Sequence, residues 1–204
     1  MIVRLDNFLS RLFSFIPGQF FGIASTLIGL VGDILGIIFY SGYNLNLMIS
    51  ILGTGPGGFF FNFGTILSGI LALFLYLYLE RVLSNDNVNR KLRKAALVSA
   101  IISCIFFIAI GIFPSYEDNL FFLYAHGIST LFCFISGAIY LVLFSYIFKK
   151  SSIFPNTLAY IGYFQTILIT IFLFTWIPLT EWLMTFGIII WVLSVSVYMI
   201  YKSL

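Results

Sequence analysis

The stretch that decides the fold is residues 19–40, QFFGIASTLIGLVGDILGIIFY, which carries a single charged residue, Asp33. A helix needs about 20 predominantly apolar residues to cross the hydrocarbon core of a bilayer. The backbone has to be helical there, because lipid offers no hydrogen-bond partner to an unpaired N–H or C=O group. The stretch therefore predicts a transmembrane helix.

The rest of the chain repeats this pattern. The 204 residues are 61% hydrophobic and only 8% charged, whereas a soluble domain is about 45–50% apolar and about 25% charged. We expect an all-α, polytopic bundle of six transmembrane helices that forms one domain over residues 17–204. The five further apolar runs occupy residues 59–79, 95–113, 120–148, 158–178 and 182–201.

The basic residues predict how this bundle is oriented. With six spans, all ten lysines and arginines fall at the termini or in the second–third and fourth–fifth connections, on one side of the membrane. The opposite side carries Glu117, Asp118 and Glu181 and no basic residue. By the positive-inside rule, both termini are expected in the cytoplasm of a multi-pass cell-membrane protein. The basic residues are Arg4, Arg11, Arg81, Arg90, Lys91, Arg93, Lys94, Lys149, Lys150 and Lys202.

Residues 1–16 form a separate amphipathic segment. Apolar residues recur there at helical spacing and polar residues share another face, which is typical of a helix that lies in the membrane interface. Pro17 is expected to end this helix. A partner-binding helix is the alternative. The apolar face holds Leu5, Phe8, Leu9, Leu12 and Ile16, and the polar face holds Arg4, Asn7, Arg11 and Ser14.

The first span carries a stripe of small residues along one helix face. Small residues let two membrane helices approach closely, so we expect this face to pack against another helix. Asp33 follows one of the glycines by four residues and borders the same face. The stripe consists of Gly22, Ser25, Gly29, Gly32 and Gly36.

Asp33, Asn62 and His126 are expected at a similar depth beneath the non-cytoplasmic surface. An ionisable residue within a span usually faces the bundle interior and has a function. Three interpretations remain open for this intramembrane polar cluster: a hydrogen-bonded clamp between helices, a pathway for protons or a solute, and a catalytic site with His126 as base. Ser50 and Ser129 are available as nucleophiles, but no pattern marks either of them.

Metal and cofactor sites are not expected. One histidine and the distant Cys104 and Cys133 do not match a zinc pattern. The glycine-rich segment 49–64, ISILGTGPGGFFFNFG, lacks the lysine and the following serine or threonine of a phosphate-binding loop. No basic soluble domain suggests nucleic-acid binding. We expect the glycines and Pro56 of segment 49–64 to let residues 45–52 fold back onto the membrane surface, and this outer loop to bring Asn62 to the depth of Asp33 and His126.

The same segment resembles a prokaryotic family of six-span membrane proteins known as domain of unknown function 998. The resemblance covers about residues 40–146. It departs at Ile51 and Ser115, which stand where the family pattern has acidic residues, so an activity that uses those acids is expected to be lost here. The first matching motif holds Ser50, Leu52, Gly53, Pro56, Phe61, Asn62, Gly64 and Gly69, and the second holds Gly111, Phe113, Pro114 and His126.

The small loops and the small-residue stripe favour a non-catalytic accessory or structural subunit that packs against membrane partners or lipid. Two alternatives stay open. One is a small proton-coupled transporter that uses an Asp33–His126 pair, and the other is a lipid-directed hydrolase at the outer leaflet. Catalytic residues are not assigned, and neither nucleotide nor nucleic acid is expected as a partner.

Overall fold

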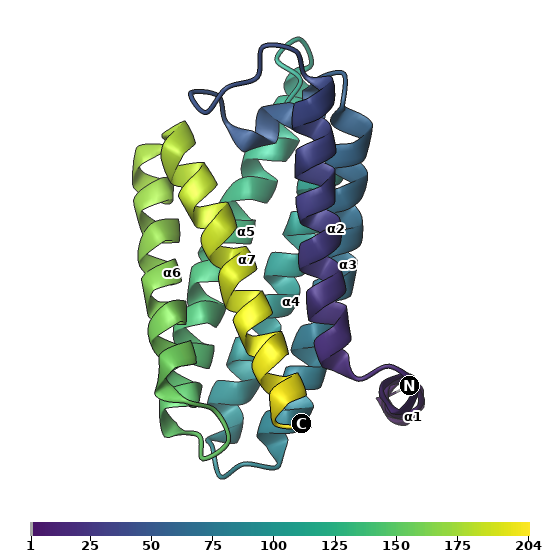
Figure 1. Cartoon of the computed structure of the whole chain (residues 1–204), viewed down its shortest axis with the longest axis vertical. Helices are drawn as coiled ribbons and strands as arrows, with labels where there is room; N and C mark the ends of the chain where they lie inside the picture. Colours follow the sequence, from purple (N-terminus) through teal and green to yellow (C-terminus); the bar gives the residue numbers. More distant parts are fainter. Residues whose placement is uncertain (1) are drawn as a thin grey trace.

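A computed structural model describes the backbone of residues 2–204 and the side chains of residues 6–204. The side chains of Arg4 and Leu5, part of the expected amphipathic pattern, lie outside the described residues. The chain is all-α (Figure 1). Its elements are α1 (Ile2–Phe15), α2 (Gly18–Phe39), the short 3₁₀ helix η1 (Ile49–Thr54), α3 (Gly58–Ser84), α4 (Arg90–Ile112), α5 (Leu120–Lys150), α6 (Asn156–Thr175) and α7 (Pro178–Tyr201).

The prediction of six long apolar helices is confirmed, and each of them is a candidate membrane span. Helices α2 to α7 are each long and apolar enough to cross a bilayer. The largest extensions beyond the expected ends are at one end of the bundle, where α3 continues to Ser84 and α4 begins at Arg90. At the other end, α6 stops at Thr175 and α7 begins at Pro178, earlier than expected. The side chain of Asn89 caps α4 by accepting hydrogen bonds from the backbone N–H groups of Lys91 and Leu92. This cap stabilises the polar first turn of α4, and the connection between the second and third spans is shorter than expected.

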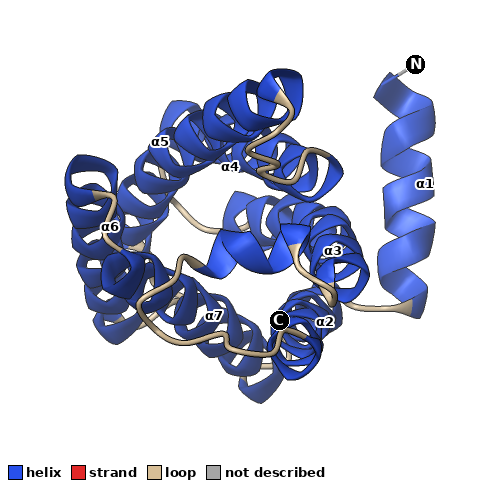
Figure 2. Ribbon diagram, turned by 90° about the horizontal axis from the view of Figure 1, so that it is seen from above, coloured by secondary structure: helices blue, strands red, loops and turns tan. Residues whose placement is uncertain are grey.

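The six spans form a closed ring (Figure 2). Each helix from α2 to α7 packs against the next one in the chain, and α7 also packs against α2. Both chain ends and the α3–α4 and α5–α6 connections lie at one end of this ring, the lower end in Figure 1. The segment with η1 lies at the other end, with the α4–α5 connection. The ring gives the molecule an axis along which an interior can form.

The element η1 closes one end of the ring. It contacts α2, α3 and α7, and Figure 2 shows it within the outline of the ring. We expected residues 45–52 to lie on the membrane surface. Leu45 is exposed, but Ile49 and Leu52 are buried in a cluster with Phe61 and Trp182. The expectation was therefore wrong for the second half of the segment, because its apolar side chains gain more by packing between helices than at a wet surface.

Glycine at position 57 permits a close backbone approach. A Cβ atom on Gly57 would lie 2.8 Å from the carbonyl oxygen of Gly36, at the end of α2. A side chain there would push the loop away from the ring. The glycines that suggested a phosphate-binding turn thus allow the loop to pack tightly.

Helix α1 lies outside the ring and crosswise to its axis (Figures 1 and 2). The buried ring of Phe13 packs edge-on against Tyr78 of α3, with 5.0 Å between the ring centroids. Arg81 donates hydrogen bonds of 3.2 Å to the carbonyl oxygen of Asp6 and to Ser10 Oγ. Phe8 and Phe15 are exposed. One side of α1 is thus attached to the ring, and apolar side chains are left on another.

Candidate functional site

The interior of the ring holds a cavity of about 140 Å³. Residues from all six spanning helices and from η1 line it. The α7 residues that line it run from Glu181 to Val192, which corresponds to about 16 Å along a helix axis. The hydrocarbon core of a bilayer is about 30 Å thick, so the cavity extends over about half of the membrane.

Two carboxyl groups lie at the η1 end of the cavity. Glu181, in the first turn of α7, is only 4% exposed, and its Oε2 accepts a hydrogen bond of 2.6 Å from the backbone N–H of Ile49. Asp33 of α2 lines the same cavity. Within residues 6–204, the Asp33 carboxyl group makes neither a hydrogen bond nor an ion pair. Glu181 is thus held by the loop, whereas Asp33 is free to bind another group.

Among the described residues that line the cavity, no cationic side chain balances these two acids. Its titratable lining residues are Asp33, Tyr76, Cys104, Cys133, Tyr140 and Glu181. No lysine, arginine or histidine is among the lining residues described. A buried ion without a partner is strongly unfavourable. Counter-charge at this end of the cavity therefore has to come from a bound proton or a bound cation.

Both acids affect the pKa of Tyr43, which lies in the loop before η1. Burial raises its pKa to about 12, and the negative charges of Glu181 and Asp33 contribute to this rise. The Tyr43 hydroxyl donates to the carbonyl oxygens of Leu47 and Met48, at 3.3 Å and 3.2 Å. Tyr43 therefore stays neutral near pH 7 and holds the loop over the two carboxyl groups.

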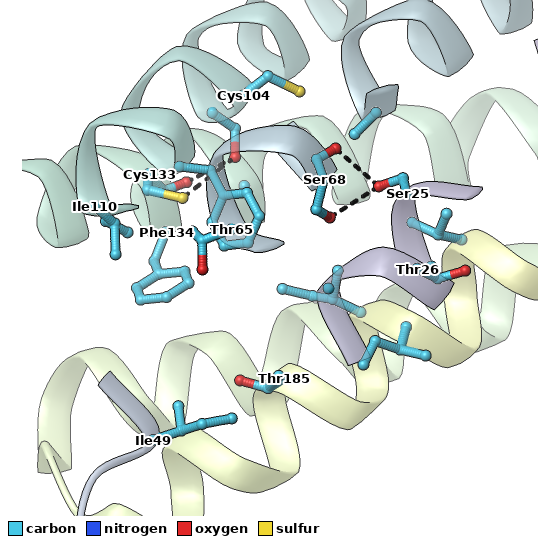
Figure 3. A pocket seen from close by; sticks show the side chains of 18 of the residues that line it. Ser25, Thr26, Ile49, Thr65, Ser68, Cys104, Ile110, Cys133, Phe134 and Thr185 are labelled. Atoms are coloured by element: carbon cyan, nitrogen blue, oxygen red, sulfur yellow. Dashed lines mark hydrogen bonds between the residues drawn. The ribbon is translucent and has the colours of Figure 1, made fainter. Parts of the chain in front are cut away.

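Deeper in the cavity, several polar side chains are hydrogen-bonded to one another, and Figure 3 shows the pair Ser25 and Ser68. Ser25 Oγ donates to the Ser68 carbonyl oxygen at 2.9 Å and lies 3.0 Å from Ser68 Oγ. The Tyr76 hydroxyl donates to the Tyr140 hydroxyl at 2.9 Å. Thr130 differs from these residues because its buried hydroxyl has no partner in the described part of the chain. An unpaired buried hydroxyl is costly, and an occupant of the cavity would satisfy it.

The small-residue stripe of α2 lies against neighbouring helices of the same chain. A Cβ atom on Gly32 would lie 3.1 Å from Gly64 Cα of α3, and a Cβ atom on Gly29 would lie 3.3 Å from Ser68 Oγ. Added Cβ atoms on Gly22 and Gly36 would also meet side chains of α3. Ser25 bonds to α3 through Ser68. The face that suggested a partner subunit is thus occupied within the ring.

Asn62 and His126 do not join Asp33. Asn62 Nδ2 donates to the Gly53 carbonyl oxygen at 2.9 Å, which holds the end of η1. His126 Nδ1 lies 2.8 Å from the Phe113 carbonyl oxygen, and since a carbonyl only accepts, Nδ1 carries the hydrogen. No hydrogen bond or ion pair joins any two of these three residues, and of the three only Asp33 lines the cavity.

The two motifs behind the family resemblance meet in space. A Cβ atom on Gly111, at the end of α4, would lie 2.7 Å from the Asn62 carbonyl oxygen of α3. Ser50 lines the cavity, Pro56 is exposed on the loop, and Pro114 is buried beside the carbonyl that His126 binds. These residues shape the η1 end of the ring.

A comparison with protein-family models supports this resemblance. A family described as "Protein of unknown function (DUF998)" matches residues 23–198. The chain belongs to this family. The match is wider than residues 40–146 and includes both Asp33 and Glu181, so it covers the ring and its cavity. No curated protein and no solved structure matches the chain.

Glu181 is the residue of this site that sequence reasoning missed. We counted it among the acids of the outer side, because it stands at the boundary of an apolar run. The sequence signal that could have indicated its burial is its position beside Trp182, at the start of a span. In the described part of the chain, no three His, Cys, Asp or Glu side chains gather as metal ligands would. The site thus consists of two acids, several hydroxyl groups and an apolar wall.

Proposed function

We propose that this protein is a small proton-coupled carrier that binds a solute in the cavity inside the ring. The observation that supports this proposal is the presence of Asp33, with no partner in residues 6–204, in a cavity lined by all six spans. Intramembrane acids of this kind commonly belong to substrate or ion pathways. In this proposal, Asp33 and Glu181 bind the protons that are coupled to solute transport, in place of the expected Asp33–His126 pair.

The accessory-subunit interpretation is less well supported. It depended on the small loops and on a small-residue face, and that face contacts α3 and α7 within the same chain. A hydrolase with His126 as base is also disfavoured. The His126 ring is buried and its Nδ1 is engaged with Phe113, and Ser129, the nearest serine in the sequence, is buried as well. A general base has to reach the proton that it abstracts.

The orientation that we propose places η1 on the outer side and both termini in the cytoplasm. The ten basic residues support this orientation, since they belong to α1 and to the helix ends and loop at the opposite end of the ring from η1. Helix α1 would lie in the cytoplasmic interface, with its exposed phenylalanines toward lipid. A fluorescent protein fused after Leu204 should fold and fluoresce in cells, whereas alkaline phosphatase at this position should be inactive. The reverse result would overturn the orientation.

Transport can be tested with the purified full chain in liposomes. Solid-supported membrane recordings, with small cationic, neutral and anionic solutes added in turn, should give a transient current for at least one class. The Asp33→Asn variant should abolish this current, whereas Asp118→Asn, an exposed acid at the same end of the ring, should retain it. Currents that survive Asp33→Asn, or no current with any of the solutes, would contradict the proposal.

A further inference from the structure

We propose that the ligand of the cavity is a small organic cation, an amine or ammonium compound with an apolar body, whose positive charge binds Asp33. This inference rests on the proposed function and names its substrate class. It is carried by the charge balance of the cavity, by an unpaired hydroxyl group within it, and by the nature of its wall.

The charge balance excludes an anion. Two carboxyl groups line the η1 end of the cavity, and no basic side chain is among the lining residues within the described part of the chain. The Glu181 carboxyl group is already bound to the backbone of Ile49. Asp33 has no partner in the described residues, so its carboxyl group is the one available to pair with a ligand cation.

The hydroxyl groups show that the cavity is suited to a ligand with polar atoms. Thr130 is 5% exposed, lines the cavity, and has no hydrogen-bond partner within the described residues. Thr185 lies one turn after Glu181, and its hydroxyl also makes no hydrogen bond within residues 6–204. Figure 3 shows the Thr185 side chain on the α7 wall, across the cavity from Phe134 and Thr65. The paired serines nearby need no ligand, whereas these two threonines are unpaired.

The wall favours an organic cation over a metal ion. Besides the two acids, the lining contains the aromatic rings of Phe61, Phe107 and Phe134 and many aliphatic side chains. Aromatic faces attract organic cations. Hard metal ions instead require about six oxygen ligands, and most hydroxyl groups of this wall are already hydrogen-bonded within the protein.

The volume limits the size of the ligand. The cavity measures about 140 Å³, and an engineered apolar cavity of about 150 Å³ is known to hold benzene. A ligand of about that volume is therefore the size to test. Benzylammonium is therefore a suitable probe, because benzyl alcohol and benzoate provide a neutral and an anionic compound of nearly equal shape.

The test is binding to the purified full chain in nanodiscs, measured by calorimetry with each of the three probes. We expect benzylammonium to bind about tenfold or more tightly than benzyl alcohol, as a charge-assisted hydrogen bond predicts, and benzoate not to bind. Asp33→Asn should remove this preference. The exposed acids supply matched controls, since Asp118→Asn and Glu117→Gln should preserve it.

Equal affinity for benzylammonium and benzyl alcohol would overturn the inference while leaving a solute-binding cavity in place. The absence of benzylammonium binding would overturn it as well, although transport currents with another solute class would still support the proposed function. Displacement of benzylammonium by millimolar sodium would identify an inorganic cation site and contradict the inference. If Asp33→Asn does not fold, the inference is tested by the order of the affinities of the three probes for the wild-type chain and for Glu181→Gln.

Discussion

The backbone N–H of Ile49 donates a 2.6 Å hydrogen bond to the Glu181 carboxylate, 132 residues later in the chain. This bond joins η1 to α7 at the mouth of the ring. Beside it, Trp182 packs with Ile49, Leu52 and Phe61. The element η1 is thus a lid over the cavity, held by the hydrogen bond to Glu181, by this apolar cluster and by the hydrogen bond from Asn62 to Gly53.

Replacement of Glu181 should loosen the lid. Glu181→Ala removes the acceptor for Ile49, whereas Glu181→Gln keeps an amide oxygen in its place. A hydrogen bond to a charged group contributes about 1.5–3 kcal/mol and a neutral one about 1 kcal/mol. Amide hydrogen exchange in peptides that cover η1 should therefore accelerate strongly in Glu181→Ala and less in Glu181→Gln. Unchanged protection in Glu181→Ala would show that this bond does not hold η1.

The contact between Gly32 and Gly64 should not tolerate a methyl group. A Cβ atom on Gly32 would lie 2.9 Å from the Phe60 carbonyl oxygen and 3.1 Å from Gly64 Cα, so α2 and α3 would have to separate. We expect Gly32→Ala to lower the stability by about 1–3 kcal/mol, measured by thermal unfolding in detergent. Gly127→Ala is the matched control, because the space around Gly127 is open, and it should be neutral or stabilising.

His126 should act on stability and not on binding. Its Nδ1 satisfies the Phe113 carbonyl at the end of α4. His126→Ala should destabilise the protein by about 1–2 kcal/mol and leave the affinity for a cavity ligand unchanged. A variant that folds with normal stability but loses binding or transport would return His126 to the proton pathway that we first considered for it.

Asp86 should make stability depend on acidic pH. It accepts hydrogen bonds from the hydroxyls of Ser151 and Ser152 and from the Ser152 backbone, which ties the α3–α4 loop to the α5–α6 loop. Burial alone would raise its pKa, but these hydrogen bonds outweigh burial and lower the pKa.

A carboxyl group with a lowered pKa stabilises the fold above the unfolded value of about 3.9, and this contribution is lost as the pH falls through the lower folded value. The difference in melting temperature between wild type and Asp86→Asn should therefore be constant above about pH 5 and shrink below about pH 4. A difference that grows toward low pH would contradict this assignment.

Composition and periodicity predicted much of the fold, because each span has to be apolar along its whole length. The closure of the ring by α7 against α2 could not be predicted, since helix order in a membrane leaves no mark on a single sequence. Asp33 was recognisable as the lone acid within a span. The burial of Glu181 could not be recognised from the sequence, because it depends on η1 folding between the helices. Asn62 and His126 were singled out by depth alone, and depth does not determine the direction of a side chain.

Position 51 is another place where the sequence alone does not show which side chains meet in space. Ile51 stands where the family pattern has an acid, which suggested a lost activity. Glu181 nevertheless brings a carboxylate to Ile49, two residues earlier. An acid at this mouth can therefore come from a distant part of the chain.

The most direct test of the central claim is thiol labelling of the cavity from the η1 side. Thr185→Cys is made in a chain that lacks the native thiols Cys104 and Cys133, both of which line the cavity. Phe186→Cys is the matched control, because this neighbouring residue is exposed on the outside of the ring. A small, positively charged methanethiosulfonate should label position 185 and leave position 186 unlabelled, and a cavity ligand should slow the reaction. Equal labelling of both positions, or no labelling of position 185, would contradict a solute-accessible cavity inside the ring.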